Sequence, residues 1–193
     1  MKHKLLLLLF MLATQAGIAQ SSTRSLVGFG SAVSGNGDLP GHSFLLGSQR
    51  YYSRFATFEV IATGTWTQAL YRFAPGYEIK EESKGVSLDA VYAPQLISGR
   101  FSFYPAIGPS VRFAHERYVK SASVWQSNGT VIEFEADVQD ENQMQLGAVL
   151  SLNADARITN KYSFGIRAAM YRYHTGQALA LVNFTLRKTG WWF

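Results

Sequence analysis

Apolar residues alternate with small or polar residues along segment 161–176, KYSFGIRAAMYRYHTG. The apolar parity consists of Tyr162, Phe164, Ile166, Ala168 and Met170. The other parity carries Ser163, Gly165, Arg167, Ala169 and Tyr171. A period of two predicts a β-strand with one apolar and one polar face. In a soluble β protein the polar face meets water, whereas in a membrane barrel the apolar face is turned outward, toward lipid.

The same alternation recurs along the chain, whereas apolar residues at the helical period of 3.6 are weak throughout. We therefore predict an all-β chain with eight strands, at 25–34, 42–52, 56–66, 86–93, 100–115, 142–158, 161–176 and 178–187. Pro105 and Pro109 lie within the fifth strand. Because proline cannot donate a ladder hydrogen bond, these positions predict local bulges.

The first residues, MKHKLLLLLFMLATQAGIAQ, have the composition of a secretory signal peptide. Lys2 and Lys4 precede a short apolar run, and small residues stand before Gln20. The run is too short to span a bilayer, so we predict a leader at 1–19 and one domain at 20–193. Past the leader, no apolar run reaches the roughly 18 residues of a membrane helix.

Composition narrows the function classes further. The chain has no cysteine, so an exported domain would be held by a closed hydrogen-bond network rather than by disulfides. Its 18 basic residues face 13 acidic ones, and Lys2 and Lys4 belong to the leader. No basic block is present, which argues against a nucleic-acid partner.

The predicted connections alternate between short and long, as in up-and-down barrels of the outer membrane. With both termini in the periplasm, the long segments around 34–41, 67–85 and 117–141 lie outside the cell. We expect 67–85 to be a polar loop. Segment 117–141 contains two alternating runs joined at Asn128–Gly129, a strong hairpin-turn signal. A protruding ribbon there could capture an extracellular protein or surface ligand through a strand edge, or stand without a partner.

The polar parity decides which face is inside. Single charged residues lie in mid-strand among Gly, Ala, Ser and Thr, and they are Glu59, Asp89, Arg112, Asp155 and Arg167. Small residues around isolated charges suit the cramped interior of an eight-stranded barrel. Buried charges need partners to offset desolvation, so we expect these acids and arginines to pair as an interior network. The apolar parity then faces lipid, with aromatic residues near the strand ends.

This pattern resembles the small outer-membrane β-barrels of the OmpA/OmpX type over nearly the whole chain after the leader. The resemblance implies an eight-stranded antiparallel up-and-down transmembrane barrel in the outer membrane, surrounded by lipid and monomeric. It also implies that the terminal aromatic residue, Phe193, is read by the barrel-assembly machinery during insertion. Phe193 has odd parity whereas the apolar face of the last strand is even, so the phase of the C-terminal tail departs from the family pattern.

We therefore expect a structural or adhesive membrane protein without catalytic site, metal or cofactor. One alternative is a lipid-modifying barrel similar to lipid A deacylases, for which the histidines after the leader are His42, His115 and His174. Glu116 is adjacent to His115 in sequence and points to the opposite face, so it cannot orient that ring. The other alternative is a secreted soluble barrel of lipocalin type.

Overall fold

The computed structural model describes residues 23–35, 39–53, 56–96, 99–127 and 130–189. They form eight strands: β1 (Thr23–Ser34), β2 (Leu39–Ser53), β3 (Ala56–Ala74), β4 (Tyr77–Pro94), β5 (Phe101–Ser127), β6 (Thr130–Arg157), β7 (Tyr162–Tyr173) and β8 (Ala178–Thr189). No helix in these ranges has the length and hydropathy needed to cross a membrane. The predicted leader 1–19, the turn residues Asn128 and Gly129, and Phe193 lie outside the described residues.

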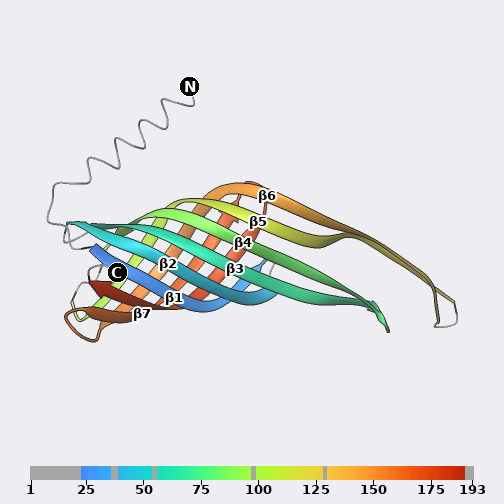
Figure 1. Cartoon of the computed structure of the whole chain (residues 1–193), viewed down its shortest axis with the longest axis horizontal. Coiled ribbons are helices and arrows are strands. Elements are labelled where there is room, and N and C mark those ends of the chain that lie inside the picture. Colours follow the sequence, from blue (N-terminus) through green and yellow to red (C-terminus); the bar gives the residue numbers. More distant parts are fainter. Residues whose placement is uncertain (1–22, 36–38, 54–55, 97–98, 128–129, 190–193) are drawn as a thin grey trace, which may run out of the picture.

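Each strand pairs antiparallel with its neighbour in sequence, and β1 pairs with β8 to close the barrel. The closing register runs from Ser25↔Lys188 to Ser34↔Leu179. Figure 1 shows the strands tilted around one axis, with the start of β1 and the end of β8 at the same end. The predicted up-and-down barrel of eight strands is therefore confirmed.

Side chains alternate strictly between the barrel interior and its outer surface along β7. Ser163, Gly165 and Arg167 are buried, whereas Phe164 and Ile166 are each 45% exposed on the outside. The other strands likewise turn their large apolar side chains outward. Exposed aromatic residues stand near strand ends, as Tyr92, Phe101, Phe103 and Tyr162 do, and also in mid-strand, as Phe29, Trp66, Phe113 and Phe184 do. A soluble protein rarely exposes so continuous an apolar surface, so this belt faces lipid.

Two hairpins extend beyond the barrel wall at the end opposite the chain termini, which we call the ribbon end (Figure 1). The expectation of a polar loop at 67–85 is wrong, because these residues continue β3 and β4 in unbroken register from Thr67↔Ser83 to Arg72↔Glu78. The hairpin closes at Gly76, whose φ of 81° lies in the left-handed region that glycine tolerates. β5 and β6 likewise run as one long ribbon through the predicted segment 117–141.

The bulges predicted at Pro105 and Pro109 are also wrong. The β5–β6 register is continuous from Phe101↔Ala156 to Val119↔Val138, and its shifts fall farther out, between Val119 and Ser121 and between Trp125 and Gln126. Neither proline has a partner on β4, because the β4–β5 register passes directly from Asp89↔Ser110 to Tyr92↔Ile107 and ends there. A missing N–H costs no ladder bond at such positions.

Candidate functional sites: the interior network and the ribbon end

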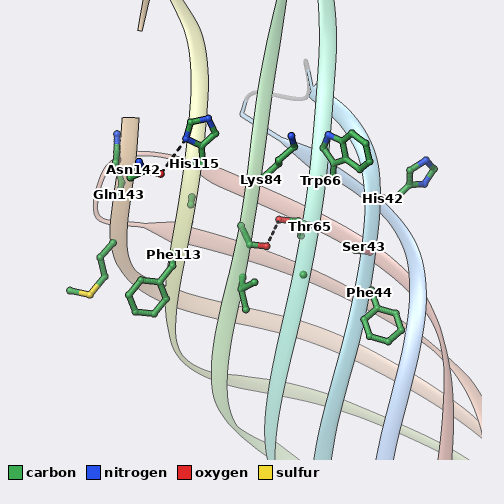
Figure 2. Close-up of a pocket in the computed structure, with 15 residues that line it drawn as sticks. His42, Ser43, Phe44, Thr65, Trp66, Lys84, Phe113, His115, Asn142 and Gln143 are labelled. Atoms are coloured by element: carbon green, nitrogen blue, oxygen red, sulfur yellow. Dashed lines mark hydrogen bonds between the residues drawn. The ribbon is translucent and has the colours of Figure 1, made fainter. Parts of the chain in front are cut away.

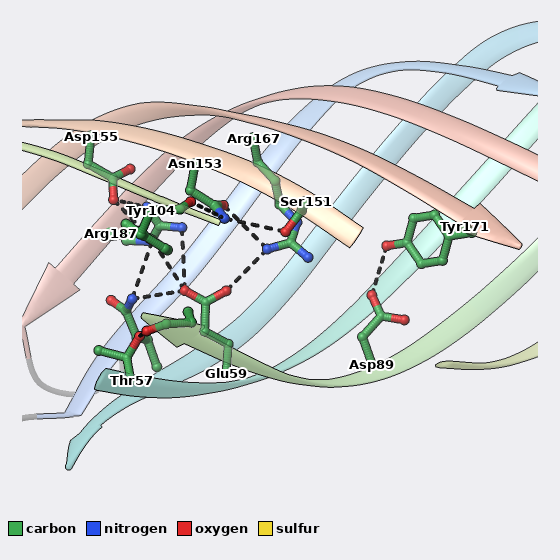
Figure 3. A network of polar contacts seen from close by, with 12 residues as sticks. Thr57, Glu59, Asp89, Tyr104, Ser151, Asn153, Asp155, Arg167, Tyr171 and Arg187 are labelled. Atoms are coloured by element: carbon green, nitrogen blue, oxygen red, sulfur yellow. Dashed lines mark hydrogen bonds and ion pairs between the residues drawn. The ribbon is translucent and has the colours of Figure 1, made fainter. Parts of the chain in front are cut away.

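The first cluster inside the barrel centres on Glu59 of β3, which is fully buried. Arg167 Nη1 on β7 lies 3.1 Å from Glu59 Oε2 and also donates to Asn153 Oδ1 at 3.3 Å. Gln49 Nε2 on β2 donates to Glu59 Oε1 at 2.8 Å. Figure 3 shows Glu59, Arg167 and Asn153 pointing toward one another from three strands. The structure thus brings Glu59 and Arg167 together as an ion pair.

Asp155 of β6 pairs with Arg187 of β8, a residue that the sequence reading left out of the network. Arg187 Nη2 also lies 3.8 Å from Glu59 Oε1, so one guanidinium serves two carboxylates. The Tyr104 hydroxyl lies 3.2 Å from a carboxylate oxygen of each acid. Gly165 makes room for Asp155, because a Cβ at that glycine would collide with the carboxylate. Arg187 stands in the same alternating row of β8 as Asn183 and Thr185. This polar row is the sequence signal that predicts an inward-pointing Arg187.

Asp89 of β4 forms no ion pair within the described residues, so the expectation that it pairs with an arginine is wrong. Two hydroxyls donate to its carboxylate instead: Tyr171 OH to Oδ2 and Ser110 Oγ to Oδ1, both at 2.7 Å. The stacked ring of Tyr173 follows Tyr171 toward the ribbon end, and its hydroxyl lies 3.1 Å from Ser87 Oγ. Short bonds to an ionised acceptor are strong, which offsets part of the cost of burying Asp89.

Arg112 of β5 has no carboxylate within ion-pair distance in the described part of the chain, which again departs from expectation. Its Nη2 donates to Ser83 Oγ at 3.0 Å and lies 3.4 Å from Thr65 Oγ1. Its guanidinium lies 5.8 Å from the centre of the Tyr173 ring. Ser83 in turn donates to Glu116 at 3.4 Å, so the buried Glu116 reaches Arg112 through a hydroxyl. The sequence predicts that Glu116 points inward, but it does not indicate this partner.

These clusters join the inner faces of the strands with contacts between residues far apart in sequence. No group of three His, Asp or Glu side chains suited to a metal ion occurs among the residues that the structure describes. Each acid is bound by arginine, tyrosine, serine or glutamine rather than held beside a hydroxyl–histidine pair. The arrangement is chemically suited to fill and cross-brace the barrel.

The histidines of the enzymatic alternative lie at the ribbon end. His115 points outward, with Nδ1 3.2 Å from Asn142 Oδ1 and Nε2 3.9 Å from Asp140 Oδ1. Glu116 is buried on the opposite face, as expected. The residues that line a wide groove beside His115 include two with hydroxyl groups, Ser43 and Thr65. Both of these side chains are buried in the barrel wall (Figure 2). The described lining therefore offers no outward hydroxyl for nucleophilic attack on a lipid ester.

The ribbon formed by 118–127 of β5 and 130–145 of β6, which we call the outer ribbon, is braced by the β3–β4 hairpin. Phe134 of β6 contacts Phe73 and Tyr77 at ring-centroid distances of 5.7 and 5.1 Å. Glu81 Oε1 accepts a hydrogen bond from the Val119 amide at 2.8 Å, just past the end of β4–β5 pairing at Arg117. Aromatic packing and this bond fix the direction in which the outer ribbon leaves the barrel.

Solved structures with the same arrangement are small barrels of bacterial outer membranes. OprG from Pseudomonas aeruginosa superposes with a TM-score of 0.58 at 10% identity, covering 88% of this chain and 97% of that one. Neisserial surface protein A superposes with a TM-score of 0.57 at 13% identity, covering 89% of this chain and 98% of that one. The chain has the fold of the small outer-membrane β-barrels. Ail of Yersinia pestis, in complex with the heparin analogue sucrose octasulfate, gives 0.54 at 10% identity, covering 88% and 99%.

No protein-family model and no curated protein matches the sequence. At such low identities the similarity concerns the fold. The lipid-facing belt of this barrel adds a second and independent argument, because its apolar side chains point outward and its charges point inward. Fold and belt together place the barrel in an outer membrane.

Proposed function

We propose that this outer-membrane barrel is a rigid, non-catalytic platform that presents the outer ribbon as a surface-binding, adhesive element. The observation that carries the proposal is the length of β6. Its pairing with β7 begins only at Gly147, whereas its pairing with β5 continues outward to Ser127↔Thr130. Residues 130–145 therefore have a strand neighbour on one side. An extended segment of another protein can add to such an edge by main-chain hydrogen bonds.

The charge of the outer ribbon suggests the chemistry of that segment. Glu133, Glu135 and Asp137 are exposed and share one parity of β6, opposite Trp125, Ser123 and Ser121 of β5. Charges on an edge strand discourage pairing between copies of the same chain. They also favour a basic partner and oppose a sulfated one. In this respect the outer ribbon differs from what would suit a heparin-like ligand such as the one bound by Ail.

The membrane part of the proposal is tested by electrophoretic mobility in SDS with and without boiling. We expect outer-membrane fractionation and a heat-dependent mobility shift, because a closed barrel stays folded in cold detergent. A protein that is soluble without detergent and shows no shift would overturn the membrane barrel and favour the lipocalin-type alternative.

The binding part is tested by hydrogen exchange on the protein in nanodiscs, with an extended peptide alternating lysine and valine. We expect slower exchange of amides in 130–145, and little change with a matched peptide in which glutamate replaces lysine. A variant lacking 121–136 retains the barrel strands and serves as the control. Equal protection by both peptides, or protection in the shortened variant outside the remaining edge residues 137–145, would refute strand addition at this edge.

A further inference from the structure

One glycine in the barrel wall differs from all the others that the described strands contain. Eight of them are turned toward the interior, where an added Cβ would come within 3.0 Å of a neighbouring atom: Gly28, Gly30, Gly41, Gly47, Gly85, Gly108, Gly147 and Gly165. Gly64 of β3 instead belongs to the outward row of Ala62 and Trp66. A Cβ at Gly64 would meet only Phe44 O, at 3.9 Å. Neither crowding nor backbone conformation requires glycine there.

The absence of a side chain at Gly64 leaves a hollow in the lipid-facing belt. Gly64 lines an open groove of about 900 Å³ that reaches from β2 to β6. The apolar lining consists of Phe44, Val86, Phe113 and Met144, each more than half exposed. A glycine inside a strand weakens it and often marks a place where a ligand approaches closely. Since the groove opens toward lipid, acyl chains are the molecules that can enter it.

The rim of the groove toward the ribbon end is polar. Figure 2 shows His42, Trp66, Lys84 and His115 in one row above the apolar lining. Trp66 Nε1 donates to Glu82 Oε1 at 2.6 Å, and Lys84 Nζ lies 2.6 Å from the same oxygen and 5.2 Å from the Trp66 ring centre. These contacts hold the ammonium group over the groove, at the depth where aromatic residues mark the membrane interface.

The charges around this rim favour an anion. Lys80 Nζ lies 3.6 Å from Glu82 Oε2, so the Glu82 carboxylate is shared by the ammonium groups of Lys80 and Lys84. On the neighbouring strand, the exposed Arg117 stands in register with both Glu82 and Asp140. The rim thus carries three cations against two carboxylates.

We propose that this groove is a binding site for a phosphorylated glycolipid of the outer leaflet, with acyl chains over Gly64 and a phosphate at Lys84. The leaflet follows from the position of the groove, at the end where the hairpins extend and away from the chain termini. The site is separate from the outer ribbon and does not depend on its binding role.

Gly64→Leu tests the proposal, because it places an apolar side chain in the hollow at a position where an added Cβ has space. Ala62→Leu is the matched control, since it adds a similar side chain to the same row of β3 outside the groove lining. Native mass spectrometry of the detergent-solubilised protein would measure retention of purified lipid A. We expect the wild type and A62L to retain it equally and G64L to lose about tenfold, equivalent to 1.4 kcal/mol. Equal retention by G64L and A62L would overturn the site.

The phosphate is tested by Lys84→Gln, which leaves Glu82 with Lys80 and Trp66. We expect K84Q to weaken retention of lipid A several-fold and to leave retention of dephosphorylated lipid A unchanged. Equal losses for both lipids would overturn the phosphate contact, and tighter retention of phosphatidylglycerol than of lipid A would overturn the glycolipid. The heat-dependent mobility shift must persist in every variant, and the variant lacking 121–136 should bind lipid A like the wild type.

Discussion

Glu59 and Arg167 connect β3 to β7 across the barrel interior, with Glu59 Oε2 and Arg167 Nη1 3.1 Å apart and both side chains almost fully buried. The two strands are not neighbours in the wall, so this ion pair braces the barrel across its width. Removing one member leaves a buried charge with fewer partners, which costs far more than an exposed pair is worth.

Arg167→Ala is therefore expected to lower the free energy of unfolding by about 3 kcal/mol, measured by urea titration in lipid vesicles. Glu59 keeps Gln49, Tyr104 and the more distant Arg187, which sets the loss at the lower end of the range for buried pairs. Adding Glu59→Gln to the same chain should recover part of the loss, because no unpaired carboxylate remains. Simple additivity of the two changes would contradict a coupled pair.

Ile166→Arg tests the assignment of faces, because Ile166 is next to Arg167 and points into lipid. We expect a cost of about 2–4 kcal/mol if the position lies near the bilayer midplane, seen as impaired insertion into vesicles. Ile158→Arg places the same charge on an exposed residue of the β6–β7 turn and should have little effect. Normal insertion of I166R would mean that this face does not meet lipid.

Tyr171→Phe removes one of the two hydroxyls that hold Asp89. A hydrogen bond to a charged group contributes more than one between neutral groups, so we expect destabilisation by about 1.5–3 kcal/mol in the same urea titration. Tyr173→Phe is the matched control, since its hydroxyl lies near Ser87 and Ser110, and it should cost about 1 kcal/mol. Equal costs for the two variants would show that Asp89 is not ionised or not bound as described.

Phe134→Ala should loosen the outer ribbon without unfolding the barrel, because Phe134 contacts the β3–β4 hairpin and no residue of the barrel interior is involved. Limited proteolysis is expected to cleave 118–127 or 130–145 faster, while the heat-dependent mobility shift is retained. Trp125→Ala, at a side chain that is 66% exposed, provides a control of similar size. Unchanged cleavage in the Phe134 variant would show that the aromatic contact does not brace the ribbon.

The alternation of single residues determined most of the architecture. Inside the membrane zone, lipid on one face and a packed interior on the other force every second residue to be apolar, so eight strands and their faces could be predicted from segments such as 161–176. The extensions of β3 and β4 were missed because their alternation is short. In 67–85 it is confined to runs such as Tyr77–Lys80, which stand beside several consecutive charged or polar residues and were therefore taken for a loop.

The partners inside the barrel were decided only by the tertiary structure. Charges at Glu59, Asp89 and Arg112 are readable from the sequence, but barrel closure and strand stagger set which ones meet across the axis. Arg187 reaches Asp155 and Glu59 because β8 closes on β1 and β7, whereas Asp89 meets Tyr171 and Arg112 meets Ser83. The groove above Gly64 likewise exists only in three dimensions, since its walls come from five strands. Alternation is a local property of a chain, while pairing across a barrel depends on the register of all its strands together.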